Sequence, residues 1–519
     1  MSADPTVLPV QLPTAAERPG VTAAERPGVT AALRTDGSTG IGGPRNSKGG
    51  PVPGSRGECD PLSVSSARSL GGVPLAELGA VAGVSRLRLH LDTAETGTLI
   101  GALLASADTA SARLAEATRQ HFGRRADDWS PQSPADLAAA LHRMLTRSRF
   151  LKGSRSCYPL QTATAEIVPF IEQHRPVTIM VTGFPFKEHD NGLKAPGAHP
   201  DLAELGALVR LRELHRAFSE LYPPGLRIVV LADGGYARPR AWSEVQRYRR
   251  RVRRYAQLVG LDPTVEFCDQ NRYVAGLLGE HGWGERERIR TRVRELIEIM
   301  AGPPRTVAEA GRADRRMVTT FGPELLTGVP SFRDLVSSLV YSVPVPAPRG
   351  ADPLRWGCTV LAAPDRVEDP ALPGELVRAR RAVLSSAWLD AVNHLAAAVA
   401  DNAVGVPGRH PLHVRLATVV SRQGCSGFSY LGGSTLLPWH GTGCLDGRGR
   451  VCADFLISLL NRGFQPVYSP ALSPATDPGE EPGGGDQPLL MVPFARTVFS
   501  EGRRRVDPEL LASARLRSR

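Results

Sequence analysis

Lysine is nearly absent from this chain of 519 residues. Lysine and arginine together number 63, but only four of these are lysines, and the formal net charge is +11. A position that requires only positive charge would therefore be expected to carry arginine. Lysine, unlike arginine, can lose its proton when desolvated and then act as a base or form an imine. Lys187 and Lys194, which share one predicted loop, are therefore candidate catalytic residues, with ordinary surface charges as the alternative.

Cysteine and long apolar runs are also scarce. The seven cysteines are scattered and odd in number, which suits reduced thiols in a cytoplasm better than a disulfide framework. No run approaches the roughly 18 apolar residues of a membrane span, and the N-terminus lacks the basic-then-apolar pattern of a secretion signal. We therefore expect a cytoplasmic protein without a membrane partner.

Composition divides the chain into segments. The N-terminal residues are rich in Pro, Gly, Ser and Thr and contain a tandem octapeptide, a composition typical of disorder. The predicted segments are a disordered low-complexity extension (1–65), a helical lead-in or cap (66–150), a catalytic domain (151–500) with a proline-rich insertion at about 344–370, and an arginine-rich tail (501–519).

A strand–helix–strand unit organises the predicted catalytic domain. Residues 177–182 form a short β-branched apolar run, and 227–232 form another, as buried strands do. Between them, leucines recur every three or four residues from 202 to 221, the spacing of one helix face. Asp201 and Glu204 form an acidic variant of a capping box at the start of that helix. A right-handed crossover would make the two strands parallel, and the sequence therefore predicts an α/β fold.

The loop between the first strand and this helix is unusually long. It covers residues 183–201, whereas strand-to-helix loops usually have about two to six residues. It leaves the carboxyl end of a strand, where open α/β sheets bind ligands, and ends at a helix N-terminus, which favours anions. Asp233 should emerge at the same edge. Polar residues of the loop could share a crevice with Asp233: Lys187, His189, Asn191, Lys194 and His199.

The segment Pro438-Trp439-His440-Gly441 also has a composition suited to a binding pocket. We expect a strand over 435–441 that runs into a loop, with Trp439 as a flat apolar wall and His440 as a titrating group. A buried tryptophan beside a satisfied histidine is the alternative. The spacings of His440 and the nearby cysteines match no zinc pattern, so we predict no metal site.

Most of the excess positive charge lies in the helix predicted around residues 247–255. Its apolar residues form a helical stripe, which places the arginines on an opposite, solvated face. No known nucleic-acid motif accompanies this helix, and we assign it no nucleic-acid partner.

A set of short motifs is dispersed over residues 150–470: Phe184-Pro185-x-Lys187, Asn191, Lys194, Gly197, Pro200-Asp201-x-x-Glu204, Tyr222-Pro223-x-Gly225, Asp233-Gly234 and Pro438-Trp439-His440-Gly441. In this order they resemble the isocyanide (isonitrile) synthase family of pyoverdine, dityrosine and xanthocillin-type biosynthesis. The resemblance is that of a divergent member, since family members usually carry Ser-Ile-His where this chain has Leu416-Ala417-Thr418.

The resemblance implies a Rossmann-like, mainly parallel sheet flanked by helices, with a helical N-terminal region and a smaller C-terminal β-containing segment. It implies that the α-amine of a tyrosine- or tryptophan-like amino acid condenses with ribulose 5-phosphate, one sugar carbon of which becomes the isocyanide, without a metal or redox cofactor. A downstream tailoring oxygenase is the implied partner. A diverged enzyme that makes another N-substituted product, such as an N-formyl amino acid, and a non-enzymatic basic binding protein remain open.

The candidate site residues combine the resemblance with the loop and charge arguments. Acid–base groups are needed for imine formation, and cationic groups are needed for a phosphate and a carboxylate. We predict as catalytic Lys187, Lys194, Asp233 and His440, and as substrate-binding Phe184, Asn191, Asp201, Glu204, Arg415 and Trp439.

Overall fold

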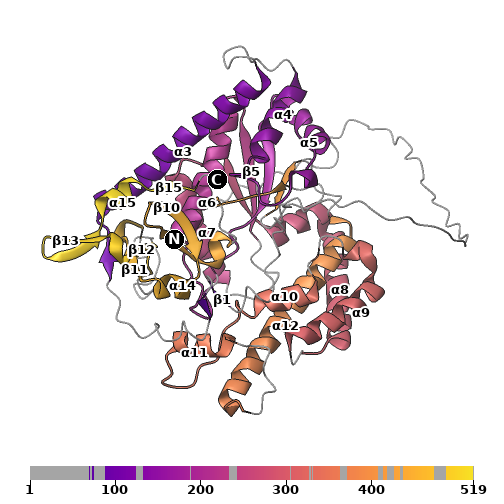
Figure 1. The fold of residues 1–519 in the computed structure, drawn as a ribbon. Helices are drawn as coiled ribbons and strands as arrows, with labels where there is room; N and C mark the ends of the chain where they lie inside the picture. The colour runs from indigo at the N-terminus through magenta and orange to yellow at the C-terminus, as the bar shows by residue number, and fades with distance from the viewer. Residues whose placement is uncertain are drawn as a thin grey trace, which may run out of the picture. The chain divides into compact units, whose positions relative to one another are not determined.

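We describe the protein from a computed structural model, drawn as a ribbon in Figure 1. Residues Pro61–Arg519 form one unit. The predicted extension over 1–65 lies outside the described residues, as does Asp233. The structure describes residues 69–70, 73–74, 88–123, 133–187, 189–232, 242–303, 306–326, 329, 331–362, 371–406, 413–417, 426–432, 436–472 and 487–517.

A parallel sheet of five strands positions the candidate site. Its order is β6-β5-β4-β7-β8, and each neighbouring pair is parallel. The α/β prediction is confirmed, because both predicted strands pair in parallel across the predicted helix. The strands are β4 (Val177–Thr182), β5 (Leu226–Ala232), β6 (Val265–Asp269), β7 (Val414–Ala417) and β8 (Ser426–Gly427).

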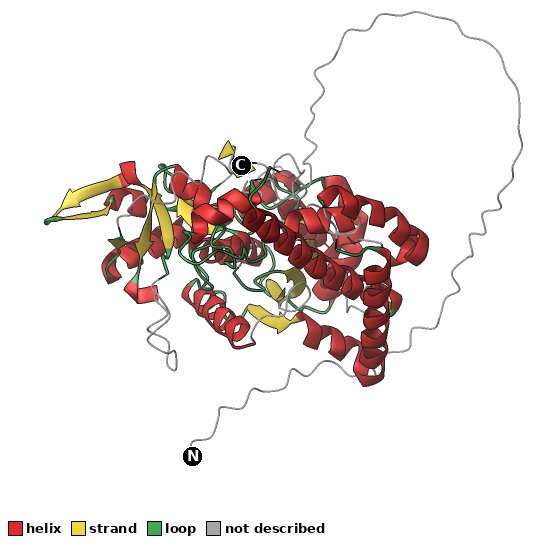
Figure 2. Cartoon of the chain, turned by 90° about the horizontal axis from the view of Figure 1, so that it is seen from below, coloured by secondary structure: helices red, strands yellow, loops and turns green. Residues whose placement is uncertain are grey.

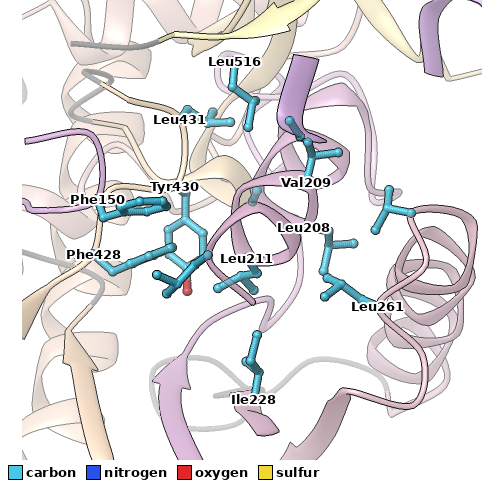
Figure 3. Packing of buried hydrophobic residues seen from close by; sticks show 14 of the residues in the cluster. Phe150, Leu208, Val209, Leu211, Ile228, Leu261, Phe428, Tyr430, Leu431 and Leu516 are labelled. Atoms are coloured by element: carbon cyan, nitrogen blue, oxygen red, sulfur yellow. The ribbon is translucent and has the colours of Figure 1, made fainter. Parts of the chain in front are cut away.

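Helix α6 (Leu202–Ser219) is enclosed on nearly all sides. Leu208 and Leu211 are fully buried, and Figure 3 shows them beside Ile228 of β5 and the aromatic rings of Phe428 and Tyr430. The predicted capping box is confirmed at Asp201, whose side chain accepts from the backbone of the first turn. Other helices of this part are α5 (Leu160–Glu172) and α7 (Trp242–Leu258).

Two N-terminal helices pack in the same hydrophobic core as the sheet. They are α3 (Thr93–Phe122) and α4 (Pro134–Leu145), which lie in the segment predicted as a helical lead-in or cap. Helix α4 begins as its sequence predicts, with Ser133 as N-cap and proline in the first turn. Because α3 makes extensive contact with α6, it covers the helix that follows the long loop.

A second core is built mainly by helices, which group together in Figures 1 and 2. Val293 and Ile297 are buried there, whereas most of their neighbours in the charge-rich stretch 284–300 are half-buried or exposed. The predicted proline-rich insertion at about 344–370 contains helix α11, which buries Cys358. The helices are α8 (Gln270–Met300), α9 (Val307–Leu325), α10 (Phe332–Leu339), α11 (Pro353–Leu361) and α12 (Gly374–Ala403).

Helix α12 is the one described helix that is long and apolar enough to cross a membrane, and 56% of its most apolar window is buried within the protein. Val383, Ala387 and Leu395 are among its residues in the second core. A helix that is apolar on most sides is expected at the centre of a helical core, and its packing accounts for its composition.

A mixed sheet of six strands forms the C-terminal part, in the order β15-β10-β9-β12-β11-β3. The predicted arginine-rich tail contributes β15 to it, and the preceding hairpin β13–β14 pairs only within itself. The elements are β3 (Leu89–His90), β9 (Thr442–Leu445), β10 (Arg450–Asp454), α14 (Leu456–Asn461), β11 (Phe464–Tyr468), β12 (Leu490–Pro493), β13 (Thr497–Ser500), β14 (Arg503–Val506), α15 (Pro508–Ala512) and β15 (Arg515–Leu516). A separate pair, β1 (Ser69–Leu70) and β2 (Val73–Pro74), is antiparallel.

The segment before β9 differs from its prediction. Pro438–His440 form a 3-10 helix, η4, rather than a strand. Proline at its first position suits a helical turn, since the ring fixes φ near the helical value and the missing N–H is not needed there.

Candidate functional site

The candidate site lies at the carboxyl edge of the parallel sheet. Chain order runs outward from β4 to β5 and β6 on one side, and β7 and β8 lie on the other side. The strand order therefore reverses between β4 and β7, and ligands of open α/β sheets bind at such a point. The long loop begins here at Gly183, whose amide donates to Leu231 at 3.0 Å.

Lys187 lies in the loop and has no exposed surface. Its ammonium nitrogen donates to both carboxylate oxygens of Glu204, at 2.9 and 2.8 Å, and to the carbonyl of Pro438 at 3.0 Å. The carboxylate of Asp201 is also 3.0 Å away. The ammonium group thus has as many acceptors as it can use, and it joins the loop, the first turn of α6 and η4.

The two carboxylates of this group are themselves held by backbone amides. Asp201 accepts from Ala203 at 2.8 Å and from Gly443 at 3.1 Å. Glu204 accepts from the amide of Asp201 at 2.9 Å and from the phenol of Tyr248 at 3.2 Å. Buried charges are tolerated when paired and hydrogen-bonded in this way.

Burial raises the pKa of Glu204 to about 8, and the charge of Asp201 acts in the same direction, whereas the charge of Lys187 opposes it. A second carboxylate beside the same cation in a desolvated site disfavours the charged form of Glu204. Burial and the nearby Glu204 also raise the pKa of Tyr248, which keeps its phenol a donor.

These contacts define what Lys187 does in the unliganded fold. It fixes η4, and with it His440, against the N-terminus of α6. Asp201 and Glu204 share this positioning role, since both are fully buried. Direct contact of Lys187, Asp201 or Glu204 with a substrate stays a prediction.

Phe184, Tyr430 and Trp439 form an aromatic wall between β4 and η4. Phe184 packs 5.2 Å from Trp439 and 5.9 Å from Tyr430 between ring centroids. Phe184 has a φ of 51°, a left-handed conformation that is uncommon outside glycine. A Cβ at Gly183 would meet Trp439 at 2.8 Å, so glycine is required there. Trp439 is only 3% exposed, which is closer to the buried alternative than to an open pocket wall.

His440 follows Trp439 and is half-buried. Its amide donates to Leu437 at 2.9 Å, and its ring meets the edge of the Trp439 ring at 6.2 Å. Of the residues predicted as catalytic, His440 is the one that lies beside the aromatic wall and is partly exposed to solvent. Its catalytic role stays a prediction.

Lys194 and Asn191 lie at the far end of the loop and face the second core. Lys194 donates to the hydroxyl of Ser342 at 2.6 Å and lies over the Phe455 ring at 5.8 Å. Asn191 donates to the carbonyl of Tyr341 at 2.6 Å. Both side chains anchor the loop to the helical part, and the structure does not bring Lys194 to Lys187's carboxylates.

A basic group that the resemblance did not mark lies beside the same loop. His199 has an enclosed Nδ1 atom without a hydrogen-bond partner. Its pKa is lowered to about 3, first by burial and then by the charges of Arg251, Arg247 and His189. The scarcity of lysine does not reveal this group, because its cations are arginines. The available signal in the sequence was the four-residue spacing of Arg247 and Arg251, which places both on one side of a helix.

The arginines of α7 are not all solvated, which corrects the sequence analysis. Arg249 is 5% exposed and Arg251 is 6% exposed. Arg249 donates to the carbonyl of Ala232 and to the carboxylate of Asp269, both at 2.9 Å. It thereby ties α7 to the ends of β5 and β6. Such an arginine is unavailable to a polyanion.

Arg415 is exposed and pairs in register with Met180. Its neighbours Val414 and Leu416 point into the first core, so Arg415 lies on the opposite face of the sheet. Its charge acts on Glu166 and on Tyr273. Among the described residues, no group of three or more His, Cys, Asp or Glu side chains is placed to hold a metal ion.

Parts of the chain are similar to known proteins. Residues 167–310 match the family described as "Pyoverdine/dityrosine biosynthesis protein". The chain is 30% identical over 114 residues to L-tryptophan isonitrile synthase of Fischerella ambigua, covering 20% of this chain and 34% of that protein. It is 32% identical over 100 residues to L-tyrosine isonitrile synthase of Xenorhabdus nematophila, covering 18% and 30%.

Two further similarities are more limited. A segment of 79 residues, 14% of this chain, is 35% identical to 5% of an isocyanide synthase–NRPS hybrid of Aspergillus fumigatus. The matches thus span about a third or less of the curated relatives. The crystal structure of the PvcA protein from Pseudomonas aeruginosa aligns with a TM-score of 0.43 at 17% identity, over 69% of this chain and 99% of that one.

Proposed function

We propose that this chain, which belongs to the pyoverdine/dityrosine biosynthesis family as a divergent member, is an isocyanide synthase. Its substrates would be a tyrosine- or tryptophan-like amino acid and ribulose 5-phosphate. The observation that carries the proposal is the edge of the parallel sheet, where the family motifs Phe184, Lys187, Asp201, Glu204 and Pro438–His440 converge. The amino acid is suggested by the names of the relatives.

The proposed chemistry needs no net oxidant. The amine attacks the ketone carbon of the sugar and water leaves, which forms an imine. Eliminations and cleavage of the carbon–carbon bonds to that carbon then leave it on nitrogen as the isocyanide. The ketone carbon and the isocyanide carbon have the same formal oxidation level, so the reaction is of the lyase and transferase type and calls for proton transfers only.

His440 is the proposed proton-transfer group. It is half-buried beside the aromatic wall, and a histidine titrates near neutral pH. Its position depends on the bond from Lys187 to Pro438. Lys187 therefore acts as a positioning residue in this account, and an arginine at 187, with its larger planar head, would displace η4. Asp233, which follows β5 in the sequence and lies outside the described residues, stays a predicted catalytic residue.

The basic group at His199 is the proposed phosphate site. The charged groups that act on His199 most strongly are the basic side chains of Arg251 and Arg247. A phosphate would supply negative charge beside Arg247 and Arg251 and an acceptor near the enclosed imidazole. Arg415 is the proposed partner for the amino-acid carboxylate, since guanidinium groups bind carboxylates through two parallel hydrogen bonds.

The free cysteines agree with the proposed cytoplasmic location. Five described cysteines are unpaired, namely Cys157, Cys268, Cys358, Cys444 and Cys452. Reduced thiols are usual in that compartment. An isocyanide product would then be available to a tailoring oxygenase as the next enzyme.

Incubation of the full-length protein with tyrosine or tryptophan and ribulose 5-phosphate tests the function. We expect a product with the mass of the isocyanide and a loss of the sugar phosphate. A product with the mass of the N-formyl amino acid, stable from the first time point, would favour a diverged reaction instead. No consumption of either substrate by protein that is folded and binds neither of them would contradict the proposal.

A further inference from the structure

A cavity of about 450 Å³ lies away from the parallel sheet, between β3 and the hairpin β13–β14. Strand β14 packs against β3, and the hairpin, yellow at the left edge of Figure 1, projects from the C-terminal part in both views. Four arginines line the cavity together with His90, Phe499 and Gly502: Arg88, Arg503, Arg504 and Arg505.

The positive charges of this hairpin cavity are mostly uncompensated. Within the described residues, Arg505 alone among the four pairs with a carboxylate, that of Glu501 at 3.0 Å. Arg504 donates to the hydroxyl of Thr497 at 3.0 Å. The Nε atom of Arg505 is enclosed and lacks a hydrogen-bond partner. Like charges gathered in this way repel one another, and an anion would relieve the repulsion.

Apolar surface is exposed next to these charges. The side chain of Phe499 is 72% exposed although it lies at the cavity. Nothing in the packing of the hairpin requires a large aromatic residue at so exposed a position. Phe499 pairs with Arg504 across the hairpin, so these two side chains share a face. An aromatic face beside a guanidinium suits a ligand that has a flat ring and anionic oxygens.

We propose that the hairpin cavity binds a small organic phosphate with at least two phosphate groups and an aromatic ring, such as a nucleoside diphosphate. The arginines would hold the phosphate oxygens and Phe499 would stack on the ring. The cavity volume lies in the range of about 300 to 1,000 Å³ that small-molecule sites usually have. This site is distinct from the carboxyl edge of the parallel sheet and does not depend on the proposed synthase activity.

Calorimetric titration of the full-length protein with ADP, with inorganic pyrophosphate and with adenosine tests the proposal. ADP should bind most tightly, pyrophosphate less tightly and adenosine weakly. Arg503→Ala removes one guanidinium and should weaken ADP and pyrophosphate about tenfold. Phe499→Ala should weaken ADP and leave pyrophosphate unchanged.

A variant that should strengthen binding and a control variant make the test specific. Glu501→Gln removes the carboxylate that pairs with Arg505, so it should tighten both ligands by roughly threefold. Arg292→Ala is the matched control, because Arg292 is an exposed arginine of helix α8 that pairs with Glu295, and it should leave binding unchanged.

Three outcomes would overturn the proposal. The first is no binding of ADP or pyrophosphate by the wild-type protein at millimolar concentration. The second is an equal effect of Arg503→Ala and Arg292→Ala. The third is binding of single-stranded nucleic acid only, with the steep salt dependence of a backbone groove. None of these readouts uses turnover, so failure of the proposed synthase function would leave them intact.

Discussion

Two groups beside the long loop, one around Lys187 and one around His199, are satisfied in different ways. Lys187 has two carboxylates and a carbonyl within 3.0 Å. His199 has an enclosed nitrogen without a hydrogen-bond partner and basic neighbours. Complete pairing indicates a group that holds the backbone in place. Burial of an unsatisfied basic atom among like charges indicates a place where a bound anion would lower the free energy.

The largest effect should follow from breaking the paired group. Lys187→Met leaves two buried carboxylates without their cation, and we expect it to lower the free energy of unfolding by about 3 to 5 kcal/mol. Urea unfolding followed by circular dichroism would measure this loss.

The double variant Lys187→Met with Glu204→Gln is the control for that measurement. It removes the cation together with one of the two carboxyl groups and should recover part of the lost stability, because fewer buried ionisable groups remain without a partner. Equal instability of the single and double variants would show that packing rather than charge pairing holds the loop.

The packing of the aromatic wall can be tested without changing any charge. Gly183→Ala would place a methyl group within 2.8 Å of Trp439, and we expect a loss of about 1 to 3 kcal/mol from overpacking. Gly447→Ala is a matched control, since a Cβ there meets nothing within 4 Å. Unchanged stability of Gly183→Ala would mean that Trp439 moves freely and that the wall is loosely packed.

Substitutions in the basic group around His199 should change the affinity for the sugar phosphate rather than the stability of the fold. Arg247→Ala should weaken ribulose 5-phosphate about tenfold and leave the affinity for the amino acid unchanged, since one charge-assisted contact to phosphate is lost. Arg250→Ala, on an exposed position of the same helix, is the control. Calorimetry with each substrate separately would detect the difference, and equal affinities in both variants would remove α7 from the phosphate site.

The smallest expected effect concerns pH. The folded-state pKa of His199 is lowered to about 3 from 6.5, so the unfolded state binds a proton that the folded state does not. Stability should therefore fall as pH drops through the unfolded pKa. His199→Gln should lessen the loss between about pH 7 and pH 5 by about 1 kcal/mol. Parallel thermal melts of both proteins over this range would check it, and identical slopes would contradict it.

The sequence predicts the parts of this molecule that depend on local patterns. The strands at 177–182 and 227–232, the capping box at Asp201 and the Ser133 cap all follow from periodicity and hydrogen-bond chemistry over a few residues. These patterns are sufficient for the α/β fold class. The parallel pairing of β7 with β4 was not predicted, because the two strands are more than 200 residues apart in the chain.

What the sequence does not predict depends on long-range contacts. Nothing local shows that Lys187 is enclosed, because its partners Glu204 and Pro438 meet only after folding. The burial of Arg249 and the helix α11 within the second core also arise from tertiary packing, which overrides the polar or proline-rich composition. The partial exposure of His440 beside a buried Trp439 likewise depends on how η4 packs against the rest of the protein.

A crystal structure of the full-length protein with ribulose 5-phosphate bound tests the central claim most directly, because it locates the phosphate relative to both charged groups. We predict that the phosphate oxygens lie within hydrogen-bond distance of Arg247 or Arg251 and close to His199, while Lys187 keeps its bonds to Glu204 and Pro438. A phosphate held by Lys187, with those bonds broken, would contradict the account and favour the original prediction of Lys187 as a catalytic residue.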